Sequence, residues 1–114
     1  MTKLTVPIAA RSLEQAKQRI QAARGGGAEM LELRVDYLED LSVELVRKLI
    51  AEARAVGKKL PLIVTCRDKR QGGAIEYPEK LRVDVLIGAL RAGVEFVDFP
   101  VVIINHARSI LIFF

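Results

Sequence analysis

Charged residues of both signs stand at the end of an apolar segment, in the run Glu32-Leu33-Arg34-Val35-Asp36. Side chains alternate along a strand, so Glu32, Arg34 and Asp36 would share one face. Burying three charges on one face of a sheet is costly unless they are paired or bind a ligand. The run therefore indicates a binding site. An internal ion-pair ladder, or a strand that ends early and leaves Asp36 in solvent, is the alternative.

A second run, Thr65-Cys66-Arg67, ends another apolar segment and would bring Arg67 to the same edge as Arg34. Two guanidinium groups suit a carboxylate, because each offers forked and permanently charged donors. The alternative is that Arg67 is simply the first exposed residue after a strand. The paired glycines of Gln71-Gly72-Gly73 allow close approach to a ligand or a tight turn, and a plain flexible loop is the default.

The elements that must position these groups follow a strand–helix alternation. We expect strands at 4–9, 29–35, 62–66 and 95–99, and helices that begin at Ser12, at Asp40 or Ser42, and at Pro78. The strands recur about every 30 residues, as in βαβ units of a parallel sheet. The fold class is therefore α/β. Part of a (β/α)8 barrel and a small open flavodoxin-like sheet both fit this rhythm.

Composition narrows the classes of function. The chain has 114 residues, of which 51% are hydrophobic, and this suits one small domain with a real core. The net charge is +4, but basic residues are spread among acids, so we expect no nucleic-acid partner. The first residues lack the long apolar stretch typical of a signal peptide, and no apolar run approaches about 20 residues, so we expect a cytoplasmic protein without a membrane partner. No metal-ligand cluster or nucleotide fingerprint is present, so we expect no metal and no cofactor.

Residues 100–114 differ in kind from the rest of the chain. We expect more strand at 100–104, a turn at 105–109, and a bare apolar segment at 110–114 that needs burial. His106, the only histidine, is expected in a surface turn.

Taken in order, five motifs have a familiar pattern: Val6-Pro7-Ile8-Ala9-Ala10, the run from Glu32 to Leu38, Thr65-Cys66-Arg67, Gln71-Gly72-Gly73, and the run from Ala92 to Asp98. Over residues 3–99 the sequence resembles the N-terminal half of type I 3-dehydroquinate dehydratases. The resemblance implies a partial (β/α)8 TIM barrel, made of the first three βα units and a fourth strand. Residues 1–99 would form this half-barrel, and residues 100–114 would be a divergent apolar tail.

The resemblance also implies a function. Members of this family are lyases of the shikimate pathway, which leads to chorismate and the aromatic amino acids. They convert 3-dehydroquinate to 3-dehydroshikimate through a lysine Schiff base, and a histidine moves the proton. By this resemblance, Glu32, Arg34 and Arg67 bind the hydroxyls and carboxylate of the small-molecule substrate.

The sequence departs from the family pattern at two places. Gln71 stands where the family has a glutamate beside the catalytic histidine, and Pro100 stands where an acidic residue is usual. The Schiff-base lysine and the histidine belong to later strands. We therefore expect a truncated form with no catalytic residue in this chain. The alternatives are a non-catalytic half-barrel that binds a small carboxylate metabolite, and a structural homodimer that pairs open sheet edges.

Overall fold

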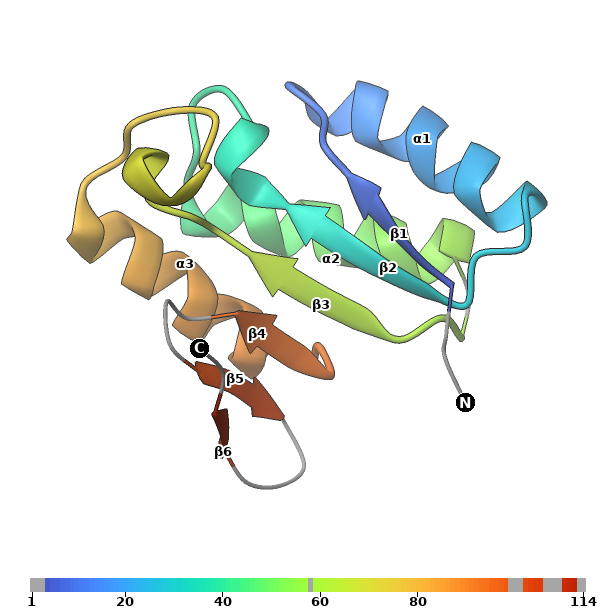
Figure 1. The fold of residues 1–114 in the computed structure, drawn as a ribbon. Helices are drawn as coiled ribbons and strands as arrows, with labels where there is room; N and C mark the ends of the chain where they lie inside the picture. Colours follow the sequence, from blue (N-terminus) through green and yellow to red (C-terminus); the bar gives the residue numbers. More distant parts are fainter. Residues whose placement is uncertain (1–3, 58, 99–101, 106–109, 113–114) are drawn as a thin grey trace.

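The computed structural model describes residues 4–57, 59–98, 102–105 and 110–112. Its strands are β1 (Thr5–Ile8), β2 (Met30–Arg34), β3 (Leu62–Thr65), β4 (Phe96–Asp98), β5 (Val102–Asn105) and β6 (Ile110–Ile112). Its helices are α1 (Leu13–Gly25), α2 (Val43–Gly57) and α3 (Glu79–Arg91), with short 3-10 helices η1 (Val35–Tyr37) and η2 (Lys69–Gln71). The expected three βα units and fourth strand are confirmed (Figure 1).

One sheet contains all the described strands, in the order β1-β2-β3-β4-β5-β6. The neighbours from β1 to β4 pair in parallel, whereas β5 pairs antiparallel with β4, and β6 pairs antiparallel with β5. Neighbouring parallel strands have their C-terminal ends on the same side of a sheet. The loops that follow β2 and β3 therefore come side by side (Figure 1).

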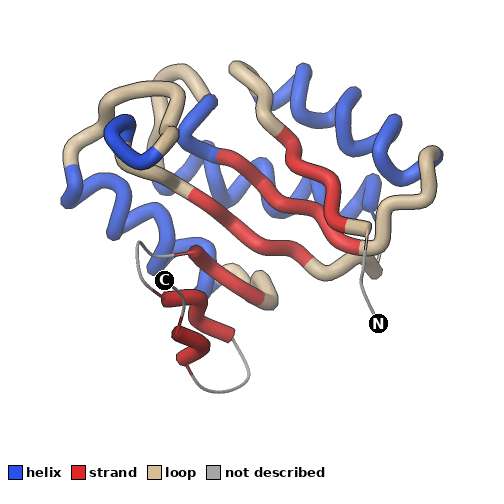
Figure 2. Tube along the Cα trace, in the orientation of Figure 1, coloured by secondary structure: helices blue, strands red, loops and turns tan. Residues whose placement is uncertain are grey.

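The three helices pack along one face of the parallel strands, and Figure 2 shows them as a layer distinct from the sheet. Side chains on that face are fully buried: Leu31, Leu33, Leu62, Val64 and Val97 each expose 0% of their surface. They meet apolar residues of the helices, such as Ile20, Val46 and Val85. On the opposite face Met30, Ile63 and Phe96 are only half-buried. Because the helices cover only one face of the sheet, polar side chains can lie on the other face.

The helix starts agree with the sequence pattern. The Ser12 hydroxyl accepts a hydrogen bond from the Gln15 backbone N–H at 3.2 Å, and the Gln15 carboxamide oxygen accepts one from the Arg11 N–H at 2.8 Å. Of the two candidates for the second helix, Ser42 is the cap, because its hydroxyl accepts from the Leu45 N–H at 3.0 Å. Both serines satisfy N–H groups that a helix leaves unpaired in its first turn.

An ion pair ties the elements together at the edge of the sheet where the strands begin. Arg54 of α2 donates to the Glu95 carboxylate at 2.9 Å and to the carbonyl oxygens of Leu60 and Gly93. Glu95 also accepts from the Leu62 N–H at 2.8 Å. Partial burial would raise the pKa of Glu95, but the hydrogen bonds from Leu62 and Arg54 outweigh it and lower that pKa. The segments that lead into β3 and β4 are thus held to α2.

Several expectations about the chain differ in detail from the structure. The strands expected at 4–9 and 62–66 extend over Thr5–Ile8 and Leu62–Thr65. Strand β2 ends at Arg34 rather than continuing to Val35, and η1 follows it at once. Asn105 belongs to β5 rather than to a turn. His106 lies outside the described residues. Within the described part of the chain, no helix is long and apolar enough to cross a membrane.

Candidate functional site

Charged and polar side chains gather at the C-terminal ends of the parallel strands, and the pairing register of the strands explains why. Arg34 of β2 lies opposite Thr65 of β3, and Thr65 lies opposite Asp98 of β4. Residues that are paired across parallel strands point to the same face. Glu32, two residues before Arg34, shares that face one layer deeper. The sheet therefore places these four polar side chains on the face that the helices leave uncovered.

Glu32 and Thr65 form the inner part of this site. The Thr65 hydroxyl is fully buried and donates to Oε2 of Glu32 at 2.8 Å. Among the described residues, none donates to Oε1 of Glu32. A half-buried carboxylate held by one neighbour and open on its other oxygen is suited to accept a hydrogen bond from a ligand hydroxyl.

Arg34 is fixed by a two-point contact with Asp36. Its Nε donates to Oδ1 of Asp36 at 3.1 Å and its Nη2 donates to Oδ2 at 2.9 Å. Burial lowers the pKa of Arg34, but the hydrogen bonds and charge of Asp36 outweigh burial and raise that pKa above its ordinary value. The Tyr37 ring lies under the guanidinium, with its centroid 5.1 Å from the guanidinium carbon. The arginine thus stays charged and keeps one orientation.

Asp36 itself lies elsewhere than the alternating pattern predicts. Because β2 ends at Arg34 and the chain turns into η1, strand alternation does not set the direction of the Asp36 side chain. The alternative in which an early strand end exposes Asp36 to solvent is also wrong, since its exposure is 0%. Its charge is compensated inside the protein by Arg34 and by the Ala74 backbone N–H.

Arg67 stands at the outer rim. Its side chain is 48% exposed and pairs with the Asp98 carboxylate at 3.3 Å. Exposed pairs of this kind contribute little to stability, about 0–1 kcal/mol. Arg67 therefore remains able to exchange its partner for an anionic ligand.

The loop that carries Gln71-Gly72-Gly73 begins directly after Arg67. Gly72 has φ of +95°, a left-handed conformation that favours glycine. At Gly73 a Cβ atom would lie 2.3 Å from the Arg67 carbonyl oxygen. The pair of glycines is thus explained by a tight turn that packs on the loop's own backbone. The Gln71 side chain is exposed beside this turn.

Further contacts anchor this loop on both sides. The Asp68 carboxylate accepts from Arg82 of α3 at 3.3 Å, and both side chains are largely buried. The Tyr77 hydroxyl donates to the Leu38 carbonyl oxygen and accepts from the Leu41 N–H. The loop is therefore an ordered wall of the site rather than a flexible connection.

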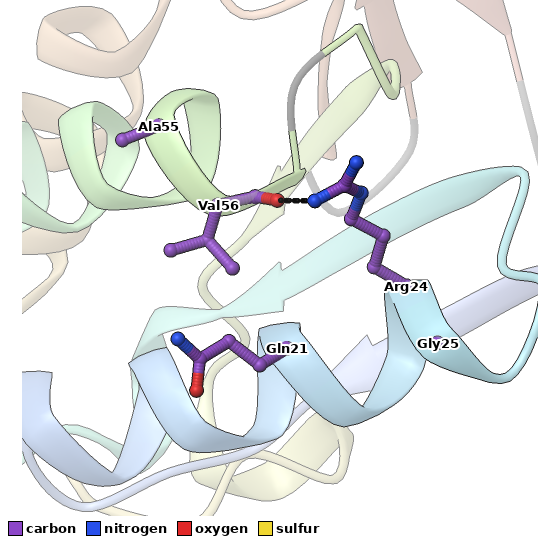
Figure 3. Close-up of a pocket in the computed structure, with 5 residues that line it drawn as sticks. All are labelled: Gln21, Arg24, Gly25, Ala55 and Val56. Carbon is purple, nitrogen blue, oxygen red and sulfur yellow. Dashed lines mark hydrogen bonds between the residues drawn. The ribbon is translucent and has the colours of Figure 1, made fainter.

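The remaining candidate features do not carry chemistry. Burial raises the pKa of the Cys66 thiol to about 12, so this thiol is not a nucleophile near neutral pH. In the described ranges no cluster of His, Cys, Asp and Glu could hold a metal ion. A hollow of about 590 Å³ is lined by Gln21, Arg24, Gly25, Ala55 and Val56 (Figure 3). It lies where α1 and α2 end, away from the charged edge, and its arginine is bonded to the Val56 carbonyl oxygen.

Comparison with known proteins identifies the family. A family model described as type I 3-dehydroquinase matches residues 4–111. The chain belongs to the type I 3-dehydroquinase family. Its relatives include a pentafunctional AROM polypeptide of Eremothecium gossypii, 40% identical over 73 residues that make up 63% of this chain and 5% of the relative. A bifunctional 3-dehydroquinate dehydratase/shikimate dehydrogenase of Arabidopsis thaliana is 30% identical over 83% of this chain and 15% of the relative.

Solved structures of the family share the fold. The type I 3-dehydroquinate dehydratase of Clostridium difficile superposes with a TM-score of 0.79 at 21% identity, over 84% of this chain and 39% of that structure. The enzyme of Enterococcus faecalis superposes with a TM-score of 0.78 at 23% identity, over 85% of this chain and 41% of that structure. These enzymes are TIM barrels. This family member therefore spans about two fifths of the barrels it matches, and it is a partial (β/α)8 barrel rather than an open flavodoxin-like sheet.

The structure of this family member brings together the residues that the sequence singled out, with partners that the sequence did not reveal. Glu32, Arg34 and Arg67 lie at one edge of the sheet, as their spacing indicated. The role of Asp98 as the ion-pair partner of Arg67 was missed. Its position at the end of a fourth strand was the signal that could have found it.

Proposed function

We propose that this chain forms the substrate-binding part of a 3-dehydroquinate dehydratase, a lyase that converts 3-dehydroquinate to 3-dehydroshikimate. Membership of the type I 3-dehydroquinase family supports the reaction. The observation that carries the binding role is the strand register, which sets Arg34 and Thr65 opposite each other with Glu32 one layer below. In barrels of this class, ligands bind where the parallel strands end.

Each of the three proposed binding residues has a distinct role. Oε1 of Glu32 accepts a hydrogen bond from a substrate hydroxyl, because Thr65 occupies only Oε2. Arg34 donates through Nη1, since its Nε and Nη2 already contact Asp36. Arg67 pairs with the substrate carboxylate in place of Asp98. Gln71 is exposed at the end of η2, directly before Gly72, and it carries no charge.

A calorimetric titration with 3-dehydroquinate tests this proposal. We expect Arg67→Ala to weaken binding about 10–100-fold, because one charge-assisted hydrogen bond is lost and Asp98 is left to repel the substrate. Arg91→Ala is the matched control, since Arg91 is an exposed arginine in the last turn of α3, at the opposite end of the sheet. Equal affinity of wild type and Arg67→Ala would remove Arg67 from the site, and no binding by the wild type would refute the proposal.

A binding function without turnover is the second candidate. None of the lysines in the described ranges, Lys17, Lys48, Lys59, Lys69 and Lys80, lies within a strand, and Lys69, in η2 of the loop that follows β3, is exposed. Borohydride reduction in the presence of 3-dehydroquinate separates turnover by this chain from binding alone. A mass increase of the chain would show a trapped imine and support catalysis, whereas binding without a mass increase would support a binding role.

A structural homodimer is the third candidate. Among the described strands β1 lies at one edge of the sheet, and a second copy that pairs with this open edge would cover it. Sedimentation over a range of concentrations tests this, and a monomer throughout would count against pairing.

We also infer that residues 1–99 form the barrel part and residues 100–114 a divergent segment. The change from parallel to antiparallel pairing at β5 supports this division. The cytoplasmic location and the absence of nucleic-acid, membrane and cofactor partners stay predictions.

A further inference from the structure

The Asp36 carboxylate is the most deeply buried charge beside the site. It exposes 0% of its surface, and it lies in η1 directly after β2. Three donors surround it: Nε and Nη2 of Arg34, and the backbone N–H of Ala74 at 3.1 Å. A buried carboxylate is tolerated only where donors compensate it, so these three contacts are needed to hold it in place.

The same carboxylate contacts two parts of the site that are far apart in sequence. Arg34 is two residues away, whereas Ala74 is 38 residues away. Nη2 of Arg34 donates in addition to the Gly72 carbonyl oxygen at 3.3 Å. The contacts at Gly72 and Ala74 bracket Gly73, and Gln71 directly precedes them. The Arg34–Asp36 pair therefore fixes the middle of the loop.

The two ends of the loop are held independently of this pair. Asp68 is bound by Arg82, and Tyr77 is bound by the backbone of Leu38 and Leu41. Loss of the Asp36 charge would leave these anchors in place. Its effect would be confined to the orientation of Arg34 and to residues 72–74.

We propose that Asp36 is the positioning residue of this site: it orients the Arg34 guanidinium so that Nη1 is left for the ligand, and it holds residues 72–74 as a wall beside it. The ligand part rests on the proposed function. A carboxylate is required because all three neighbours are donors. An asparagine at this position would turn an N–H group toward at least one of them.

Asp36→Asn tests the proposal, with two NMR readouts that need no ligand. In the wild type we expect a resolved Arg34 Nε–H resonance, and an Ala74 amide that exchanges at least about tenfold more slowly than that of Glu76. In Asp36→Asn we expect the Arg34 resonance to be lost and the Ala74 amide to exchange about tenfold faster. Asp84→Asn is the control with the same change of charge, because Asp84 lies in an exposed pair with Lys80, and it should alter neither readout.

The affinity for 3-dehydroquinate provides the third readout. We expect Asp36→Asn to weaken binding about tenfold, and Asp84→Asn to leave it unchanged. The proposal would be overturned if Asp36→Asn left the Arg34 resonance and the Ala74 exchange rate unchanged. It would also be overturned if both NMR readouts changed but the affinity for 3-dehydroquinate did not. If Asp36→Asn does not fold, the NMR measurements on the wild type decide the role of Asp36. The proposal is overturned if the wild type shows an averaged Arg34 Nε–H resonance and an Ala74 amide that exchanges rapidly. If the wild type binds no 3-dehydroquinate, the proposed function fails, and the NMR readouts alone decide the role of Asp36.

Discussion

Replacing Gly73 with alanine should destabilise the loop beside the site, and the structure sets the size of the effect. A Cβ atom at this position would lie 2.3 Å from the Arg67 carbonyl oxygen and 2.9 Å from the carbonyl carbons of Arg67 and Asp68. Ordinary contacts between such atoms are about 3.5 Å, so the backbone must move by about 1 Å. Backbone atoms cannot swing aside as a flexible side chain can.

That movement affects two hydrogen bonds, from the Gly73 N–H to the Asp68 carbonyl oxygen at 3.0 Å and from the Ala74 N–H to Asp36 at 3.1 Å. Steric overpacking costs about 1–3 kcal/mol, and the loss of a buried hydrogen bond costs a similar amount. Because the loop can relieve part of the strain by opening locally, we expect a decrease of about 2–3 kcal/mol in the free energy of unfolding.

Urea unfolding followed by far-UV circular dichroism measures this change, since the chain has no tryptophan. Two other glycines serve as controls. Gly72 has open space but φ of +95°, so Gly72→Ala should cost about 1 kcal/mol. Gly25 has open space at the end of α1, so Gly25→Ala should stabilise by about 0.4–1 kcal/mol. If Gly73→Ala is as stable as Gly72→Ala, the close approach to the Arg67 backbone does not limit this position.

Two further predictions concern titrating groups. The folded-state pKa of Glu95 lies below its ordinary value, so its contribution to stability is present above about pH 4.3 and is lost as the pH falls through the lower folded pKa. Glu95→Gln should therefore make the stability less dependent on pH below about 5 in acid titrations of the unfolding free energy, and an unaltered slope would speak against the Arg54–Glu95 contact. The Cys66 thiol, with its pKa raised to about 12, should resist Ellman's reagent at pH 8 in the folded chain and react fully in urea. Rapid labelling without urea would show that this thiol is accessible.

The periodicity of the sequence was sufficient to predict the order of the three βα units and the fourth strand. Apolar runs such as 62–66 predicted the strands, and their recurrence about every 30 residues predicted parallel pairing. The common edge of Arg34 and Arg67 follows from parallel pairing alone. These inferences succeeded because they depend on short-range geometry.

Contacts between distant residues could not be predicted in the same way. Asp36 was expected to continue the alternation of β2, but the strand ends at Arg34, and one of the donors that compensate Asp36, the Ala74 N–H, comes 38 residues later. The pairing of Asp68 with Arg82 has the same character, since it joins a loop to a helix that the chain forms afterwards. Local propensity carries no information about such partners.

The Arg54–Glu95 contact has a consequence for how the protein tolerates sequence change. It lies at the edge of the sheet where the strands begin, and it joins α2 to the segments before β3 and β4. None of its hydrogen bonds involves Glu32, Arg34 or Arg67. Divergence of the residues around the ligand, whether natural or engineered, can therefore proceed without disturbing the spacing of these strands.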